Sequence, residues 1–288
     1  MSSIRVLQTF SAVAAEGSFA AAAGRVALTQ AAVGQQMRAL EGELRRPLFE
    51  RQGKAVVLNE SGRALVPQVR RLLALYEQML APSGEEHAMA GTVHLGAIVS
   101  AVRPLIQATL ALKARHAGLD LHVSAGKSIE LIPRVQSGEL DGAVAVREPG
   151  AGPDLAWTPL YAEPMVLLVP KRLEDASPRA LLQSQPFIRF DPSQHTGRLV
   201  ERSLRRRRVK PQEFLELNAL ESIAELVRSG LGVSVVPLLR DARWHADARL
   251  RVIELPRAEE RRIALVQRRD APKAHIVAAV ASQPTLAA

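Results

Sequence analysis

The stretch SFAAAAGRVALTQAAVGQQMRAL, residues 18–40, decides the fold of the N-terminal part of the chain. Ser18 and Thr29 are typical helix N-caps, and each precedes a short segment whose apolar residues recur at helical spacing. Only Ala27 and Leu28 remain between the two segments, which leaves room for a tight turn. Two short helices joined by such a turn predict a helix-turn-helix motif.

Further secondary structure is predicted on both sides of this motif. Apolar residues at helical spacing from Ile4 to Ala14 predict a helix that Gly17 ends. Downstream, residues 51–58 read as a strand, a turn at Gly53 and a second strand. The first 58 residues are therefore expected to form one compact, mainly helical domain with a β-hairpin wing.

A long helix capped by Asn59 is predicted to follow. Its apolar residues step by four and three and form a heptad seam: Leu65, Val69, Leu72, Tyr76 and Met79. A second copy of the chain is the simplest partner for this seam, and packing onto the chain's own N-terminal domain is the alternative. Pro67 removes one backbone hydrogen bond inside the helix, and Pro82–Gly84 is expected to end it.

From Thr92 onward the period of the sequence changes. Short β-rich runs alternate with helical segments, and two of these helices end at Gly138 and Gly230, the residue type typical of a left-handed C-cap. Such alternation predicts an α/β architecture with mainly parallel sheets. The predicted strands are Thr92–Ile98, Leu119–Val123, Gly142–Val146, Met165–Val169, Phe187–Phe190, Phe214–Leu217, Val233–Val236, Leu250–Leu255 and Ile263–Val266.

Composition narrows the function of the chain. Its 288 residues carry a net charge of +9, which favours a polyanionic partner, nucleic acid before an anionic membrane. The absence of cysteine excludes disulfides, thiolate metal ligands and thiol redox sensing. Without a signal peptide or an apolar run of about 20 residues, we expect a cytoplasmic protein that does not contact membranes. No motif of an enzyme, a metal site or a cofactor site is present.

Several motifs carry a family resemblance. The N-terminal ones are FSAVA (10–14), GSF (17–19), AA (22–23), LTQAAV (28–33), RALE (38–41), Leu44, PLFER (47–51) and LNESG (58–62). The C-terminal ones are GTVHLG (91–96), SGELD (137–141) and VRSGLGV (227–233), with Pro237 after the last. Together they resemble LysR-type transcriptional regulators over essentially the whole chain, most specifically over Phe10–Gly62.

This resemblance implies an α+β multidomain fold. A winged helix-turn-helix DNA-binding domain is expected at 1–58, and a linker and dimerisation helix with a hinge at 59–90. A two-lobed α/β effector-binding domain, similar to type 2 periplasmic solute-binding proteins, is expected at 91–288. Its lobe one would comprise about 91–158 plus 262–288, and its lobe two about 159–261.

The resemblance also implies a ligand-responsive transcription factor. Such a protein binds a double-stranded DNA operator as a homodimer, often as a homotetramer, and RNA polymerase is a further partner. The apolar face of the reading helix is used for the core, so the opposite face is expected to meet the major groove. The predicted DNA-binding residues are Thr29, Gln30, Ala31, Gly34, Gln35, Arg38, Arg51 and Lys54.

These residues have different predicted roles. Gln30 and Gln35 are expected to read bases and Ala31 to meet a thymine methyl group, while the other polar residues contact the DNA backbone. The family usually has Pro at position 31 and Ser at 34, and often Arg at 35. Gly34 has no side chain, so one direct contact with DNA is expected to be missing from the predicted reading surface. The alternative is an ordinary solvated helix face, and for Arg51 a structural ion pair.

A second set of residues is predicted to bind a small effector between the lobes. The carboxyl ends of strands, where open α/β sheets bind ligands, are followed here by hydroxyl and basic residues at helix starts. This chemistry favours an anion such as a carboxylate metabolite. The predicted effector residues are Ser100, Lys127, Ser128, Arg147, Phe190 and His195. Helix capping by the two serines and a surface-loop position for His195 are the alternatives.

Two other functions fit parts of this pattern. A sequence-tolerant architectural DNA-binding protein would explain the charge but not the α/β module. A solute-binding protein or a small-molecule enzyme would explain the module, but the chain lacks a signal peptide and a catalytic set. The four arginines Arg205–Arg208 are expected to form a solvated helix face or a charged subunit interface, with a second nucleic-acid contact as the alternative.

Overall fold

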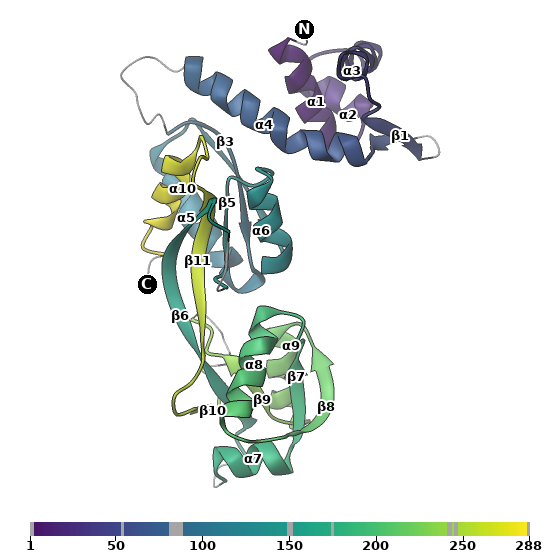
Figure 1. Ribbon diagram of the computed structural model, residues 1–288. Helices are drawn as coiled ribbons and strands as arrows, with labels where there is room; N and C mark the ends of the chain where they lie inside the picture. Colours follow the sequence, from purple (N-terminus) through teal and green to yellow (C-terminus); the bar gives the residue numbers. More distant parts are fainter. Residues whose placement is uncertain are drawn as a thin grey trace.

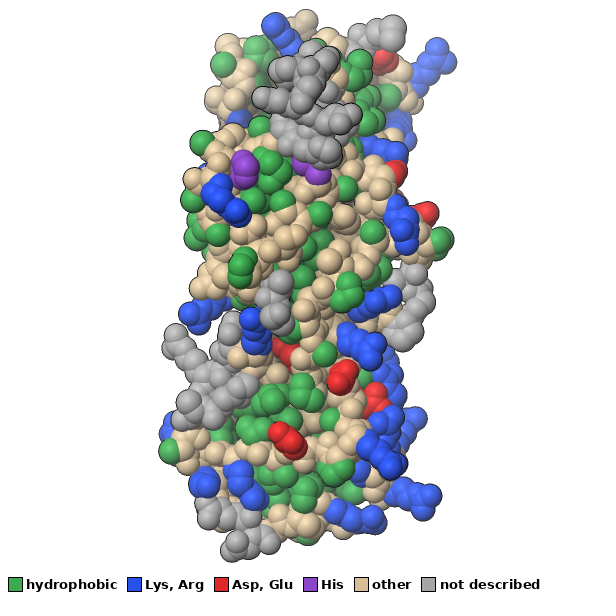
Figure 2. Space-filling view, turned by 90° about the vertical axis from the view of Figure 1, so that its left-hand side faces the viewer, with side chains coloured by type: hydrophobic (Ala, Val, Ile, Leu, Met, Phe, Trp, Pro, Cys, Tyr) green, Lys and Arg blue, Asp and Glu red, His purple; other side chains and the backbone are tan. Residues whose placement is uncertain are grey.

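The computed structural model describes residues 3–52, 55–80, 89–148, 152–173, 176–240, 244 and 247–286. Figure 1 shows three parts that follow one another along one long axis, with the N-terminal domain and a long helix at one end. The space-filling view in Figure 2 shows the same elongated molecule, with more Lys and Arg than Asp and Glu side chains on the visible face. Three features predicted from the sequence lie outside the described residues: the turn at Gly53, the site residue Lys54 and the helix end at Pro82–Gly84.

The N-terminal domain is the predicted helix-turn-helix with a two-stranded wing. Gly17 ends the first helix with a φ of 69°, and the hydroxyls of Ser18 and Thr29 each accept a hydrogen bond of 3.2 Å from the backbone N–H three residues on. Both predicted N-caps are therefore confirmed. The elements are α1 (Ile4–Glu16), α2 (Phe19–Arg25), α3 (Gln30–Leu44), β1 (Phe49–Gln52) and β2 (Ala55–Leu58).

The long helix α4 (Glu60–Leu80) belongs to this domain at its first half. Asn59 caps it, because the Asn59 Oδ1 accepts a hydrogen bond of 2.9 Å from the Gly62 N–H. Leu65 and Val69 are buried in the same core as the helices of the N-terminal domain. For these two residues the prediction of a dimer seam is wrong, because α4 packs here against α1 of its own chain. The second half of the helix is different: Leu72 is 44% exposed and Met79 81%.

The remaining chain alternates strands and helices, as predicted. The first elements are β3 (Gly91–Ala97), the short 3-10 helix η1 (Val99–Ala101), α5 (Val102–Arg115), β4 (Leu119–Ala125), α6 (Ser128–Gln136), β5 (Gly142–Val146) and β6 (Leu155–Pro170). Next come α7 (Pro178–Ser184), β7 (Pro186–Phe190), α8 (His195–Arg206), β8 (Gln212–Leu217) and α9 (Leu220–Arg228). The last are β9 (Ser234–Pro237), β10 (Leu250–Glu254), β11 (Glu260–Arg268) and α10 (Ala274–Ala281).

These elements form two lobes with separate hydrophobic cores. We use "first lobe" for the part whose buried core residues lie within 93–155 and 263–286, and "second lobe" for the part whose core residues lie within 165–255. The long strands β6 and β11 run through both, and Figure 1 shows them crossing from one lobe to the other. Glycines end α6 and α9 as predicted, since Gly138 and Gly230 have φ of 77° and 80°.

The prediction of mainly parallel sheets is wrong for the large sheet. Its strand order is β10-β6-β11-β5-β3-β4, with β9 also on β6. Within the described residues of this sheet, β3 pairs in parallel with β4 and β5, but β6 is antiparallel to β9, β10 and β11. The reason is that β6 leaves the first lobe and β11 returns to it in the opposite direction. None of the helices in the described ranges is long and apolar enough to span a lipid bilayer.

Candidate DNA interface and effector cleft

The reading helix α3 presents one face to the core and another to solvent. Val33, Met37 and Leu40 are at most 2% exposed and fill the domain core. On the other face the structure brings together Gln30, Ala31, Gln35 and Arg38, all of them exposed. This face therefore offers two amides, a methyl group and one guanidinium to a partner.

Gly34 lies differently from the prediction. It is buried, and a Cβ atom at this position would lie 3.8 Å from Phe19 Cδ2 and 3.9 Å from Arg38 Nη2. Arg38 folds back over it and its Nε donates a hydrogen bond of 3.3 Å to the Gly34 carbonyl. The expectation that Gly34 faces away from the core is wrong, because α2 and the Arg38 side chain cover it.

The wing is positioned by a residue that the sequence analysis did not select as functional. The Oε1 of Glu41 accepts hydrogen bonds from the backbone N–H groups of Leu48 at 2.7 Å and Phe49 at 3.2 Å. This carboxylate ties the end of α3 to the start of β1. Arg51 lies in β1 opposite Val56 of β2, so its backbone belongs to the wing as predicted. A carboxylate in the last turn of a helix, six residues before the PLFER motif, is a signal that could have found Glu41.

Five of the six predicted effector residues line one cavity of about 590 Å³ between the two lobes. They are Ser100, Lys127, Ser128, Phe190 and His195. Arg147 does not line it, and the prediction for this residue is wrong. Its neighbours Val146 and Glu148 do line the cavity, and since successive residues of a strand point to opposite sides, the Arg147 side chain points outward.

Helix starts surround this cavity. The first residues of η1 and α5, of α6, of α8 and of α9 all contribute to its lining. The N-terminus of a helix carries a partial positive charge and free backbone N–H groups, so each of these starts favours a negatively charged ligand. Lys127 and Arg103 add full positive charges, while Val99, Ile129 and Phe190 make part of the wall apolar.

A buried ion pair forms the floor of the cavity. Arg261 on β11 is 4% exposed and its Nε donates a hydrogen bond of 2.7 Å to Oε2 of Glu163, which is 2% exposed. The Arg261 Nη2 also donates to Ser100 Oγ at 3.0 Å. Sequence reasoning missed Arg261, although it continues the two-residue spacing of the apolar Ile263 and Leu265 on the same strand, which is the signal of an inward position.

Two predicted residues have structural partners that define their roles. Ser128 Oγ accepts a hydrogen bond of 3.0 Å from the Val146 N–H and so joins the start of α6 to the end of β5. His195 begins α8 and is 9% exposed, so it is not a surface-loop histidine. Burial lowers the pKa of His195, while Glu148, whose Oε1 lies 3.5 Å from His195 Nδ1, acts in the opposite direction.

Glu148 links the lobes. It follows β5 of the first lobe, and its Oε2 accepts a hydrogen bond of 2.8 Å from Nη2 of Arg198 on α8 of the second lobe. This ion pair bridges the two lobes at the edge of the cavity, so a large change in their separation would break it.

The arginine run at 205–208 ties α8 to a neighbouring turn. Arg206 Nη2 lies 2.7 Å from Oε1 of Glu259, and Arg207 Nη2 donates a hydrogen bond of 2.7 Å to the Pro256 carbonyl. Arg205 and Arg208 are exposed. Half of the run thus has an intramolecular structural role, and the rest is a solvated surface, in line with the prediction of a solvated face.

Comparisons with known proteins match both parts of the chain. The family model described as bacterial regulatory helix-turn-helix protein, lysR family, matches residues 4–63, and the model described as LysR substrate binding domain matches residues 86–283. The chain is 30% identical over 237 residues to the HTH-type transcriptional regulator CzcR of Bacillus subtilis (strain 168), covering 81% of this chain and 80% of that protein.

Solved structures have the same fold. A full-length OxyR cysteine variant from Pseudomonas aeruginosa superposes with a TM-score of 0.75 at 23% identity, covering 99% of this chain and 96% of that one. Full-length CbnR complexed with its target DNA gives 0.63 at 18% identity, covering 96% and 98%. The chain belongs to the LysR family of transcriptional regulators, with a DNA-binding helix-turn-helix domain followed by an effector-binding domain.

Proposed function

We propose that this regulator reads a specific operator with the exposed face of α3 and responds to a small anionic metabolite bound between its lobes. The observation that carries the first half is the grouping of Gln30, Ala31 and Gln35 on the solvent side of a helix whose other side is core. Glutamine can pair bidentately with adenine in the major groove, and alanine can contact the thymine methyl group. The neighbour CbnR was solved with its target DNA, which supports the same mode here.

Replacing both glutamines tests the operator contact. In Gln30→Ala with Gln35→Ala, affinity for the specific operator should fall at least tenfold, because each lost base contact is worth about 1–3 kcal/mol. Affinity for random DNA should change little, since phosphate contacts supply non-specific binding. Footprinting and gel shifts on the DNA upstream of the coding region measure both. Gln68→Ala, which removes an exposed glutamine on α4, is the matched control.

Two outcomes of this experiment would contradict the proposal. An unchanged footprint in the double variant would remove α3 as the base-reading surface. Steep salt dependence with no operator preference in the unmodified protein would instead favour a sequence-tolerant architectural protein, which the net charge of +9 also suits.

The effector proposal rests on the chemistry of the interlobe cavity. Its volume of about 590 Å³ falls within the range of small-molecule sites, about 300–1,000 Å³. Converging helix starts with Lys127 and Arg103 favour a carboxylate or a similar anion, and the apolar wall favours a hydrocarbon portion in the same ligand. The metabolite can act on DNA binding only by favouring one arrangement of the lobes, and hence of the assembled heads, over another.

A thermal-shift screen of small carboxylates and amino acids would identify this effector. For a carboxylate that raises Tm, Lys127→Gln should weaken binding about tenfold, because it removes one charge-assisted contact. Arg147→Gln is the matched control, since this cation follows the neighbouring strand but its side chain lies outside the cavity. Equal losses in the two variants would show that general charge, not the cavity, binds the ligand.

The assembly proposed here is a homodimer through the second half of α4, with a homotetramer as its extension. Leu72, Leu75 and Met79 are 44%, 47% and 81% exposed, which is a large apolar surface for one helix end. Pairing two chains along this seam would bury it and place two reading helices on a two-fold operator. A mass of one chain at micromolar concentration in analytical ultracentrifugation would contradict this assembly.

A further inference from the structure

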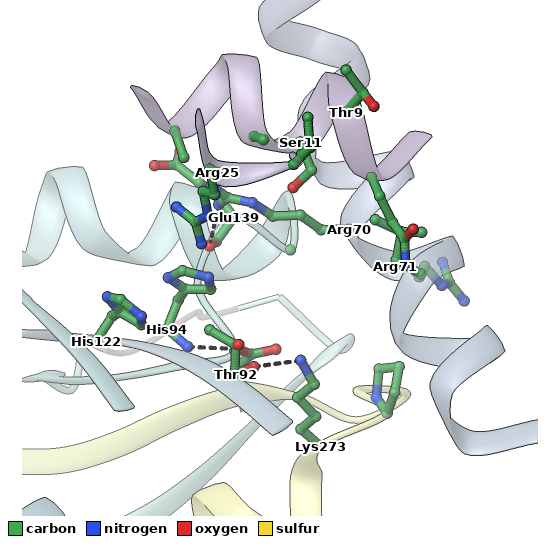
Figure 3. Close-up of a pocket in the computed structure, with 18 of the residues that line it drawn as sticks. Thr9, Ser11, Arg25, Arg70, Arg71, Thr92, His94, His122, Glu139 and Lys273 are labelled. Carbon is green, nitrogen blue, oxygen red and sulfur yellow. Dashed lines mark hydrogen bonds between the residues drawn. The ribbon is translucent and has the colours of Figure 1, made fainter. Parts of the chain in front are cut away.

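A second cavity, of about 910 Å³, lies where the N-terminal domain, α4 and the first lobe meet. We call it the junction cavity. Its walls come from α1, the turn between α2 and α3, α4, the strands β3 and β4, the 138–141 turn and the segment before α10. Figure 3 shows side chains from α1, α2, α4, β3, β4 and the 138–141 turn around this space, together with Lys273. It is distinct from the effector cavity, with which it shares no lining residue.

Positive charge dominates the lining of the junction cavity. It contains two carboxylates, Glu139 and Asp141, against six basic side chains: Arg5, Arg25, Arg70, Arg71, Arg268 and Lys273. Some of these cations are paired. Arg25 Nη1 lies 3.0 Å from Glu16 Oε1, and Arg71 and Arg268 share the one carboxylate of Asp270, at 2.7 and 2.8 Å. The Glu139 carboxylate is itself occupied by Arg134 at 2.8 Å, so it neutralises the cavity only in part.

Arg70 and Lys273 are hydrogen-bonded to neutral carbonyl groups, although the buried carboxylate of Asp141 lies close enough to interact with both. Arg70 Nη1 donates a hydrogen bond of 2.9 Å to the Glu139 carbonyl, and Lys273 Nζ donates to the Thr92 carbonyl. Among the described residues, neither forms an ion pair within 4.0 Å of a carboxylate. Burial is the largest cause that lowers the pKa of Arg70, with Glu139 and Asp141 opposing it. A half-buried guanidinium held by a neutral carbonyl is costly, and an anion beside it would offset that cost.

The two cations also lie close enough to act on the same neighbour. His94 on β3 stacks on His122 of β4 with ring centroids 5.1 Å apart. Burial lowers the pKa of His94 to about 4, helped by the positive charges of Arg70, His122 and Lys273. His94 is therefore neutral near pH 7 and available as a hydrogen-bond donor. Arg70 and Lys273, whose positive charges help burial to lower this pKa, would also attract an anion into the cavity.

We propose that the junction cavity binds a small anion with two or more negative charges, of the phosphate type, held between Arg70 of α4 and Lys273 of the first lobe. The cavity is large enough to admit such an anion, and charge-assisted hydrogen bonds to tetrahedral oxyanions are strong. The Ser11 hydroxyl on α1, which points into the same space in Figure 3, would complete the contacts from the N-terminal domain. A bound anion would thus fasten the DNA-binding domain to the first lobe.

The proposal is tested by titrating the full chain with inorganic pyrophosphate, ADP and inorganic phosphate in thermal-shift and calorimetric experiments. We expect pyrophosphate to raise Tm and to bind at least tenfold more tightly than phosphate, because it can reach both cations. Binding of ADP with similar affinity would assign the site to phosphate esters, and binding of pyrophosphate alone would assign it to inorganic anions. No effect of any of the three at millimolar concentration would overturn the proposal.

Charge-removing variants locate the bound anion. Arg70→Gln and Lys273→Gln should each weaken pyrophosphate binding about tenfold or more, because each removes a charge-assisted hydrogen bond. Arg179→Gln, which removes an exposed charge on α7, is the matched control and should bind pyrophosphate within about twofold of the unmodified protein. Lys127→Gln in the effector cavity and Arg38→Gln on the reading helix test whether the anion binds at those sites instead. If Arg70→Gln does not fold, Lys273→Gln decides alone.

Different failures of this experiment have different meanings. An equal loss in Arg179→Gln would show diffuse attraction to a basic protein and would overturn the site. A loss only in Lys127→Gln or Arg38→Gln would place the anion in the effector cavity or on the DNA surface, which overturns the junction site but leaves the proposed function standing. Hydrogen exchange adds a second readout, because pyrophosphate should slow amide exchange in both α1 and the 138–141 turn. Slowing in neither would contradict the proposal that the anion holds the DNA-binding domain against the first lobe.

Discussion

Arg261→Met is expected to destabilise the effector-binding domain by about 3–5 kcal/mol, because it leaves the Glu163 carboxylate buried without its guanidinium. Glu163 is 2% exposed and Arg261 4%, so water cannot replace the lost hydrogen bond of 2.7 Å. The Ser100 hydroxyl at the cavity floor also loses its contact with Arg261 Nη2. Urea unfolding followed by circular dichroism measures the loss, and effector binding should weaken in parallel.

The neighbouring residue provides a matched control. Arg262 lies next to Arg261 on β11, but its side chain is 74% exposed and its ion pair with Glu260, at 3.7 Å, is on the surface. Arg262→Met should therefore change the free energy of unfolding by less than about 1 kcal/mol. The double variant Arg261→Met with Glu163→Gln should recover part of the stability, because it also removes the buried negative charge that Arg261 offset. Equal effects of Arg261→Met and Arg262→Met would contradict a buried ion pair.

Phe10→Ala is expected to unfold the DNA-binding domain and abolish operator binding while the effector-binding domain stays folded. Phe10 is fully buried and packs edge to face on Phe49, with ring centroids 6.1 Å apart. Truncating a buried phenylalanine to alanine costs about 3–5 kcal/mol, which is comparable to the whole stability of a domain of this size. Gel shifts report the loss of binding. In thermal unfolding we expect two transitions for the unmodified protein and one for the variant.

Phe214→Ala is the control for this change. It removes the same side chain from a position on β8 where Phe214 is 60% exposed, so stability should change by less than about 1 kcal/mol. Retained operator affinity in Phe10→Ala would mean that the core of the N-terminal domain does not depend on the contact between α1 and the wing.

Local signals predicted the elements well because their causes are local. Serine and threonine caps at Ser18 and Thr29 satisfy free N–H groups of the next turn, and glycines at 138 and 230 adopt a left-handed conformation that other residues avoid. The sequence was less informative where a strand serves two lobes. The part of β6 that pairs with β11, residues 155–164, contains Pro159 and Pro164, which argue against a strand.

Side-chain direction was the other source of error in the candidate site. Arg147 lies between Val146 and Glu148, which both line the cavity. Its own side chain points to the opposite side of the chain and therefore lies outside the cavity. Gly34 is covered by Arg38, a contact that depends on a rotamer and not on a motif. The position of Arg261 can be predicted only when it is known which face of β11 meets the second lobe. The junction cavity can be predicted only when it is known how parts far apart in the sequence pack together.

The helix α4 has a mechanical consequence. It has 21 residues, so it is about 31 Å long. One end is buried in the core of the DNA-binding domain, and the other end exposes the apolar surface that would contact a second chain in the proposed dimer. Because the helix is long, a small rotation at one end becomes a larger displacement at the other. A tilt of about 10° at the end that contacts the second chain displaces the end in the DNA-binding domain by about 5 Å, more than the rise of one base pair, about 3.4 Å. In the proposed dimer, a small rotation between the two chains would therefore move a reading helix along the DNA by more than one base pair.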